Sequence, residues 1–259
     1  MSELTVRARP EGFGGVLLRA GDAAYDEART VFNAAIERRP AMIAQCESAA
    51  DVQAAIRYGV DRDLEIAVRG GGHGVAGHAV VDDGLVVDLR RMNGVQIDPD
   101  ARIARVGGGA TWGDLDRACR SYWLATTGGR VSTTGVAGLT LGGGSGWLER
   151  KFGFACDSLV SVELVTADGR LLIADETKNA ELFWALHGGG GNFGVATSLE
   201  FQLHPVNEIY GGPMFYEVSE AENVLRFYRE YIADAPEQMG AFPAFQIAQI
   251  GRASCRERV

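Results

Sequence analysis

The sequence has little cysteine, no excess of basic side chains and no long apolar run. Its four cysteines (Cys46, Cys119, Cys156 and Cys255) lack CxxC spacing, so neither a zinc site nor a disulfide framework is expected. Lysine and arginine total 25 against 34 acidic residues, a net charge of −9, which argues against a nucleic-acid or anionic-membrane partner. No segment is apolar enough to span a bilayer, and the N-terminus lacks a signal-peptide pattern. We therefore expect a cytoplasmic protein with reduced thiols.

Histidine is also scarce, with His73, His78, His187 and His204 as its only occurrences. These residues have neither HExxH spacing nor nearby acidic partners, so no metal site is expected. Ser145 lies among glycines, but its neighbours at two positions on either side are Gly143 and Trp147. The GxSxG pattern of a hydrolase nucleophile is therefore absent.

Glycine, in contrast, is abundant, with 35 residues. These glycines cluster in residues 70–77, 107–109, 128–146 and 188–194, between segments that have the patterns of regular structure. Glycine is needed where the backbone dihedral φ is positive or where the backbone must approach a ligand closely. Several such loops in one chain indicate a large ligand contacted by backbone at many points.

The apolar patterns predict a mixed α+β chain without internal repeats. Helices are expected at 48–58, 111–121, 179–186 and 220–232, and strands at 64–69, 85–89, 95–97, 102–106, 161–166, 170–174 and 195–203. Two pairs of these strands flank the turn residues Pro99-Asp100 and Asp168-Gly169, which predicts two hairpins. The glycine clusters stop after Pro205, and we place a domain boundary near residue 206.

Two stretches match the GxGxxG dinucleotide fingerprint by letter, at 72–77 and 189–194. The fingerprint has meaning only between a strand and a following helix, whose N-terminus faces the pyrophosphate. The first stretch is expected to lead into a turn and another strand, and the second lies between a helix and a strand. We therefore reject a Rossmann interpretation of both.

The loop that begins at Gly70 keeps a physical meaning without that context. A glycine run after a strand can form a nest, in which successive N–H groups point into one anion-binding concavity. Arg69 adds a positive charge beside it. His73 is either a functional side chain or a polar turn residue, and the residues alone leave both options open.

The ordered motifs resemble the FAD-binding domain of the vanillyl-alcohol-oxidase/para-cresol-methylhydroxylase superfamily, in its berberine-bridge-enzyme-like branch. The resemblance covers roughly residues 36–206. Several motifs in a fixed order over such a length are more specific than any single glycine pattern. The motifs that carry it are VRGGGHG at 68–74, DL at 88–89, MN at 92–93, VGGGATWGDL at 106–115, GVAGLTLGGGSG at 135–146, KFG at 151–153 and LFWALHGGGGNFG at 182–194.

This resemblance implies a cofactor, FAD, and the residues that hold it. His73 occupies the position of the histidine that bonds covalently to the flavin 8α-methyl carbon, and residues 69–74 match the pyrophosphate loop. The other implied cofactor contacts are Arg69, Gly70, Gly71, Gly72, Gly74, His78, Gly109, Gly135, Val136, Gly138, Thr140, Gly143, Gly144, Gly146, Asn192, Gly194 and Val195.

The sequence departs from the family pattern in informative places, of which Val131 bears on the cofactor bond. Some members form a second flavin bond through a cysteine just before the loop at residue 135. Here Val131 occupies that position, so we predict a single covalent bond, to His73. Val136 occupies a position that controls oxygen access in the family, where valine resembles the oxygen-reactive members, although simple packing would also favour it.

The resemblance also implies a domain plan. Residues 1–35 form an N-terminal segment, 36–206 a two-subdomain FAD-binding domain of the para-cresol-methylhydroxylase type, and 207–249 the truncated start of an α+β substrate domain. Residues 250–259, IGRASCRERV, resemble a translated sequencing-library adapter. We expect them to be a non-native tail and exclude them from fold reasoning.

The implied function is that of an FAD-dependent oxidoreductase. We expect an oxidase that passes a substrate hydride to covalently bound flavin and then electrons to O2. A dehydrogenase with another acceptor stays open, and so does a catalytically incomplete flavin-binding fragment. The expected partners are a small-molecule substrate and O2. The substrate and the catalytic base depend on residues beyond 206, so the sequence identifies neither.

Overall fold

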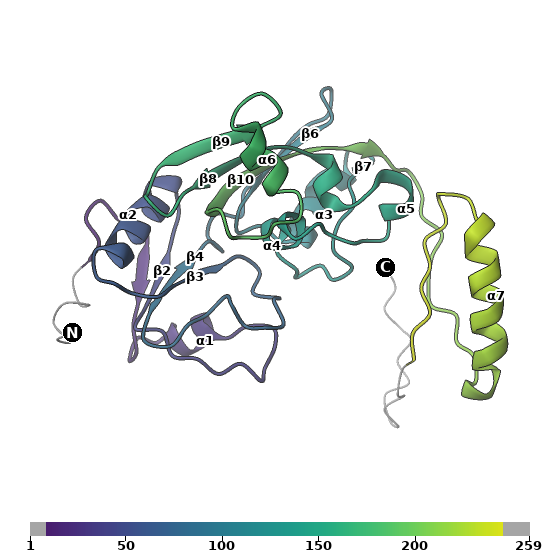
Figure 1. The fold of residues 1–259 in the computed structure, drawn as a ribbon, viewed down its shortest axis with the longest axis horizontal. Helices are drawn as coiled ribbons and strands as arrows, with labels where there is room; N and C mark the ends of the chain where they lie inside the picture. Colours follow the sequence, from purple (N-terminus) through teal and green to yellow (C-terminus); the bar gives the residue numbers. More distant parts are fainter. Residues whose placement is uncertain (1–8, 246–259) are drawn as a thin grey trace. The chain divides into compact units, whose positions relative to one another are not determined.

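The computed structural model describes residues 9–245. These residues divide into two compact units, one that ends at Ile209 and one that begins at Tyr210. The first unit contains two larger β-sheets with helices packed on them, and a small two-stranded sheet (Figure 1). The mixed composition confirms the predicted α+β class.

The first sheet has four strands in the order β1-β2-β4-β3. Its central strands are parallel, and only β1 runs antiparallel to its neighbour. The strands are β1 (Val16–Leu18), β2 (Met42–Gln45), β3 (Ile66–Arg69) and β4 (Leu85–Asp88). Because β2, β3 and β4 are parallel, their carboxyl ends meet at one edge of the sheet.

Helices cover both faces of this sheet, which explains the unbroken run of apolar residues in β4. Leu85 and Val87 pack on the side of α2 (Ala49–Val60), whereas Val86 packs on the opposite side with Tyr25 of α1 (Tyr25–Arg29). Strands of parallel sheets are buried on both faces and therefore read as unbroken hydrophobic runs. The predicted buried strand at 85–89 is confirmed.

The second sheet has five antiparallel strands in the order β5-β6-β10-β8-β9. Both predicted hairpins are confirmed, because β5 pairs with β6 and β8 pairs with β9. The strands are β5 (Val95–Asp98), β6 (Ile103–Gly107), β8 (Leu159–Val165), β9 (Leu171–Asp175) and β10 (Val195–Gln202). A small sheet pairs β7 (Leu124–Ala125) with β11 (His204–Pro205).

Three helices share a hydrophobic core with the second sheet. They are α3 (Trp112–Arg120), α4 (Val136–Leu141) and α6 (Ala180–Ala185), which contribute Trp112, Val136 and Phe183 to this core. A separate cluster joins α2 to Val165 and Val195, at the ends of strands in the second sheet. The two sheets are therefore connected through α2 as well as through the chain.

The start of α2 is stabilised by a buried carboxylate. Asp51 accepts hydrogen bonds from the N–H groups of Gly14, Gly15 and Glu47 and from the Ser48 hydroxyl, and Ser48 caps the helix in return. Burial alone would raise the pKa of Asp51, but these hydrogen bonds outweigh it and lower the pKa below 3.8. The predicted capping-box-like start is confirmed at Ser48.

We expect Asp51→Asn to lower the free energy of unfolding by about 2 kcal/mol at pH 7, because the amide leaves buried donors unpaired. A lowered folded-state pKa means that the carboxylate stabilises the fold above its unfolded pKa and loses that effect as the pH falls. Urea unfolding of both proteins should therefore show that the difference in their free energy of unfolding becomes smaller below about pH 4. Asp61→Asn, at an exposed position, serves as the control. A difference in the free energy of unfolding between wild type and Asp51→Asn that does not change with pH would contradict the stabilising role of the Asp51 carboxylate.

The glycine-rich stretch from 128 to 153 is more regular than its sequence suggests. It contains α4 and α5 (Glu149–Phe152), which the sequence did not predict, and η1 (Ala155–Ser158) follows it. Helix α4 has no side-chain cap; its first residue, Val136, is tied by its N–H to the carbonyl of Ala110. Tertiary contacts, rather than helix propensity, account for this element.

The second unit begins with irregular chain and then forms η2 (Val218–Glu220) and α7 (Ala221–Asp234). The helix predicted at 220–232 is thus confirmed. The expected non-native tail at 250–259 lies outside the described residues. Across residues 9–245, every helix is too short or too polar to cross a bilayer.

Candidate functional site

The predicted cofactor loop lies at the carboxyl edge of the parallel sheet. Arg69 ends β3 and aligns with Asp88, which ends β4. Residues 70–77 follow β3 and lead through turns to β4, which confirms that the first GxGxxG match lacks the helix of a Rossmann unit. Ligands of open α/β sheets bind at this edge, so the fold places the glycine loop where a ligand can be held.

Charge at this edge is locally positive, although the whole chain is acidic. Asp88 is fully buried and accepts three hydrogen bonds from the Arg90 guanidinium, with a shortest N–O distance of 2.7 Å. Arg69 is also buried, and its Nη1 donates to the carbonyl of Ala28. Burial and the nearby Arg90 charge lower the pKa of Arg69 to about 10, so it stays protonated at neutral pH. Because Asp88 is paired with Arg90, the buried Arg69 charge is available to a bound anion.

The loop itself offers unused backbone donors. Within the described residues, the N–H groups of residues 71–74 donate to no protein acceptor. Gly72 has a φ of +71°, and a Cβ at this position would lie 3.4 Å from Arg69 Nε. The loop is therefore a run of free donors beside a buried guanidinium, as an anion-binding nest requires.

His73 is half-buried and is held by residues distant in sequence. Its Nε2 lies 2.8 Å from the Thr133 hydroxyl, and its Nδ1 lies 3.4 Å from the Thr134 hydroxyl. The Phe32 ring stacks on the imidazole with 4.2 Å between centroids and 16° between planes. Burial lowers the pKa of His73 below 6.5. The imidazole is therefore neutral at pH 7, with one nitrogen lone pair available as a nucleophile.

The Thr133 segment reaches His73 because the glycine-rich stretch folds back onto the start of α3. The N–H groups of Trp112 and Gly113 bond to the carbonyls at residues 134 and 132, respectively. Gly71 and Gly135 then meet backbone to backbone, since a Cβ on Gly71 would lie 2.3 Å from the Gly135 nitrogen. Two glycines at this crossing bring the loops at 70–74 and 131–136 together.

Seven of the predicted site glycines fall into two groups. In the first group, a Cβ would collide with backbone, as at Gly109, where the carbonyl oxygen of Leu89 would lie at 1.7 Å. Gly135, Gly146 and Gly194 belong with it, at 2.5, 2.1 and 2.5 Å from backbone atoms. In the second group a Cβ would meet open space, and its members are Gly74, Gly138 and Gly143. The fold itself requires the first group and also Gly143, whose φ of +104° favours glycine, whereas a ligand can explain Gly74 and Gly138.

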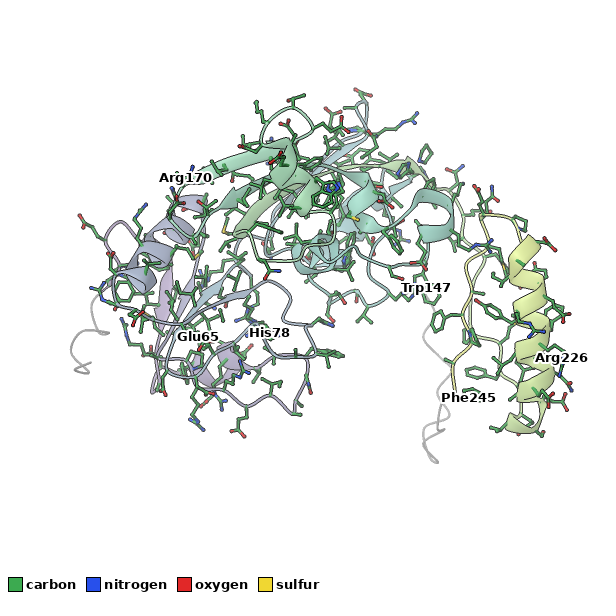
Figure 2. The ribbon with its side chains drawn as sticks, viewed as in Figure 1. Glu65, His78, Trp147, Arg170, Arg226 and Phe245 are labelled. Carbon is green, nitrogen blue, oxygen red and sulfur yellow. The ribbon has the colours of Figure 1, made fainter. Side chains whose placement is uncertain are left out.

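The remaining predicted residues are placed differently. The side chains of Val136, Thr140 and Val195 are buried in the protein core. Asn192 is exposed and donates to the carbonyl at residue 189, and His78 is exposed on the loop after β3 (Figure 2). The cofactor roles predicted for these five residues stay predictions.

Gly70 and Gly144 complete the predicted set. A Cβ on Gly70 would lie 3.3 Å from the Gly108 carbonyl oxygen, so the first glycine loop touches the one at 107–109. Gly144 has a φ of +86°, and its carbonyl accepts from the Ala155 N–H. Three of the four glycine clusters thus meet around residues 70–74.

One buried polar atom beside the glycine loop lacks a partner, and another lies in α4. Arg69 Nε and the Thr140 hydroxyl are both buried and lack a hydrogen-bond partner within the protein. An unpartnered buried polar group is costly unless something satisfies it. With the free N–H groups of 71–74, the Arg69 donor suits a large anionic cofactor such as FAD.

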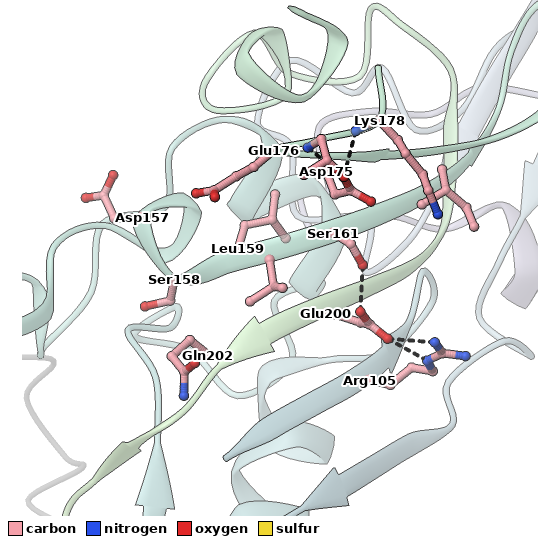
Figure 3. A pocket seen from close by; sticks show the side chains of 13 residues that line it. Arg105, Asp157, Ser158, Leu159, Ser161, Asp175, Glu176, Lys178, Glu200 and Gln202 are labelled. Atoms are coloured by element: carbon pink, nitrogen blue, oxygen red, sulfur yellow. Dashed lines mark hydrogen bonds and ion pairs between the residues drawn. The ribbon is translucent and has the colours of Figure 1, made fainter. Parts of the chain in front are cut away.

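A hollow of about 640 Å³ lies elsewhere, on the outer side of the second sheet (Figure 3). Glu200 bridges Arg105, at 2.6 Å, and Ser161, at 2.7 Å, on its floor. None of the glycine-loop residues lines this hollow, and residues 9–245 contain no group of histidine, cysteine and acidic side chains suited to a metal ion. The hollow is therefore not the predicted site.

Comparison with known proteins agrees with this geometry. A family described as "FAD binding domain" matches residues 40–175, just over half of the chain. The chain is similar to (R)-6-hydroxynicotine oxidase of Paenarthrobacter nicotinovorans, with 41% identity over 197 residues. That alignment covers 76% of this chain and 43% of the relative, so the chain spans less than half of that protein's length.

Solved structures of related oxidases share the fold. The 6-hydroxy-D-nicotine oxidase of Arthrobacter nicotinovorans has a TM-score of 0.75 and 40% identity, over 76% of this chain and 44% of its own. A glucooligosaccharide oxidase from Acremonium strictum has a TM-score of 0.69 and 34% identity, over 73% and 40%. The flavin of the latter is described as 6-S-cysteinyl, 8α-N1-histidyl FAD. The predicted branch and the para-cresol-methylhydroxylase type of fold are confirmed.

Sequence reasoning missed the residues around the His73 ring. Thr133 and Thr134 lie in the stretch used to discuss Val131, and two hydroxyls before a glycine could have been noted as polar partners. Phe32 has no sequence signal, because its contact with His73 depends on the return of the chain after α1.

Proposed function

Because the chain belongs to the family of proteins with this FAD-binding domain, we propose that it holds FAD through one covalent bond to His73. We further propose that the whole protein is an oxidase of small molecules. The observation that carries the proposal is the position of His73. Its neutral imidazole lies beside free backbone donors and the orphaned Arg69 Nε.

The chain's own residues have separable tasks. The N–H groups of 71–74 and the positive charge of Arg69 bind the pyrophosphate. Arg90 pairs with Asp88, which leaves the Arg69 charge available to the cofactor. Nothing lies within 4 Å of a Cβ added at Gly138, so this face of α4 can accept the ring system. A bound flavin supplies the two-electron acceptor for substrate oxidation. Thr133 and Phe32 orient the imidazole.

The proposal is tested on the purified chain mixed with FAD and then precipitated with acid. A covalent adduct should stay yellow after denaturation and should raise the mass by one FAD. The flavin should map to the peptide that contains His73. Colour that is lost completely to the supernatant would contradict the covalent bond, while flavin on a second peptide would contradict the single attachment predicted from Val131.

Reactivity with O2 separates an oxidase from a dehydrogenase. We expect dithionite-reduced, FAD-loaded protein to be reoxidised by O2 well above the rate of free reduced flavin, with production of hydrogen peroxide. Stopped-flow absorbance of the flavin measures this rate. Slow reoxidation by O2, with fast reoxidation by an artificial quinone, would favour a dehydrogenase.

A second candidate is a flavin-binding fragment without turnover. Its support is that the alignments cover only 43% and 44% of the nicotine oxidases, so the parts of those proteins that meet substrate can lie outside the matched region. The chain would then load FAD but fail to reduce it with alcohols, sugars or amines. Flavin bleaching under anaerobic conditions with such substrates distinguishes the two candidates.

A further inference from the structure

The His73 ring is contacted by two chain segments that are distant from it in the sequence. Phe32 stacks on one face of the imidazole. Thr133 and Thr134, 60 and 61 residues further along the chain, contact its two nitrogens. A side chain that acts only as a polar turn residue needs no such contacts.

The Phe32 segment is fastened to the His73 loop by hydrogen bonds. The Phe32 N–H donates to the Gly72 carbonyl at 3.1 Å, and Asn33 Nδ2 donates to the Val75 carbonyl at 2.8 Å. These two bonds lie on either side of His73 in the loop. Phe32 is nevertheless 64% exposed, so core packing does not explain its position.

The two threonines contact the imidazole unequally. The distance of 2.8 Å from Thr133 Oγ1 to Nε2 is that of a normal hydrogen bond, whereas 3.4 Å from Thr134 Oγ1 to Nδ1 allows only a weak one. A neutral imidazole carries a proton on one nitrogen and a lone pair on the other. The Thr133 hydroxyl can donate or accept, and in the tautomer in which Nε2–H donates to it, the lone pair is on Nδ1.

We propose that Thr133 and Phe32 are positioning residues for flavin attachment: Thr133 keeps the proton on Nε2, and Phe32 fixes the ring plane, so that Nδ1 is presented as the nucleophile. This inference rests on the proposed covalent bond between FAD and His73. It adds which residues select the reacting nitrogen.

The bond formation balances with O2 as the oxidant. A new bond joins Nδ1 to the 8α carbon of the flavin, and one C–H bond of the 8α-methyl group breaks. The methyl proton and one imidazole proton leave, and two electrons remain in the flavin. O2 then accepts two electrons and two protons and forms hydrogen peroxide, which leaves an oxidised histidyl flavin.

The test follows attachment itself rather than turnover. The full chain without FAD, and variants of it, are mixed with FAD, and covalent flavin is measured over time from in-gel fluorescence and intact mass. NMR of the isolated flavin peptide then identifies the bonded nitrogen. The variants are Thr133→Val, Thr133→Ser, Phe32→Leu and, as a matched control on the same segment, Ser132→Ala.

We expect Thr133→Val to attach FAD at least tenfold more slowly and to give a mixture of Nδ1 and Nε2 adducts. Thr133→Ser should restore the wild-type rate and product, because it keeps the hydroxyl, and Ser132→Ala should behave as wild type. Phe32→Leu should slow attachment at unchanged affinity for FAD, measured in a His73→Ala background. A purely structural role would change the amount of folded protein but not the bonded nitrogen.

Two failures are distinguishable. If the wild-type chain binds FAD without forming a bond, the proposed attachment is overturned and this inference falls with it. If the wild-type chain forms the bond, and Thr133→Val and Phe32→Leu form it at the same rate and at the same nitrogen, only the positioning role is overturned. Attachment of the wild-type flavin at Nε2 would also overturn the role of Thr133.

Discussion

His73→Ala is expected to abolish covalent FAD completely while the protein stays folded. The imidazole contacts hydroxyls and one exposed ring, so its loss should cost only about 1 kcal/mol of stability. The free N–H groups of 71–74 and Arg69 remain in the variant. FAD should therefore still bind reversibly, and acid precipitation should release all of it.

The second histidine of the same loop gives the matching comparison. His78 is exposed five residues after His73, and His78→Ala should keep the full covalent mass increment, with any loss confined to reversible affinity. Mass spectrometry of the denatured proteins and flavin fluorescence titration measure these quantities separately. Covalent flavin that persists in His73→Ala, or disappears in His78→Ala, would overturn the central assignment.

Local sequence patterns predicted the elements that show a clear run of apolar residues or a clear turn signal. The hairpin pairing β8 with β9 was visible because two apolar runs flank Asp168-Gly169, and the strand at Leu85–Asp88 was visible because both of its faces are buried. Helix α4 was not predicted, since Val-Ala-Gly-Leu-Thr-Leu has a weak helical pattern and depends on contacts with a distant segment.

The site shows the same division between local and long-range information. The glycine loop and His73 were identifiable from their motif, and the structure gives them a positive edge and free donors. The stacking of Phe32 on His73 depends on the fold of the intervening 40 residues, which no local pattern encodes. The sequence also does not distinguish the two roles of glycine. Gly109 is required by a close backbone contact, whereas Gly138 faces open space.

These two roles lead to opposite expectations for the same substitution. Gly109→Ala would place a Cβ 1.7 Å from the Leu89 carbonyl oxygen and 2.3 Å from its carbon, so the backbone itself must move. We expect a loss of about 3 kcal/mol or more in the free energy of unfolding, at the upper end for overpacked positions. Urea unfolding in the absence of FAD measures this loss.

Gly138→Ala, in contrast, should not lower the free energy of unfolding. Gly138 lies within α4, and a methyl group added there would meet nothing within 4 Å, while alanine in a helix is favoured over glycine by about 0.8–1 kcal/mol. The variant should therefore be as stable as wild type or slightly more so. If the open space belongs to FAD, the new methyl group should weaken FAD binding about tenfold, by a steric cost of roughly 1–3 kcal/mol.

The pair is informative because each variant controls for the other. Destabilisation by Gly109→Ala with unchanged stability in Gly138→Ala would show that the close approach at Leu89, and not loss of glycine as such, is responsible. Weaker FAD binding in Gly138→Ala, measured on protein of wild-type stability, would assign the open face of α4 to the cofactor. Unchanged FAD binding there would mean that the flavin does not reach α4, and the cofactor would have to be held by residues 69–74 and their neighbours alone.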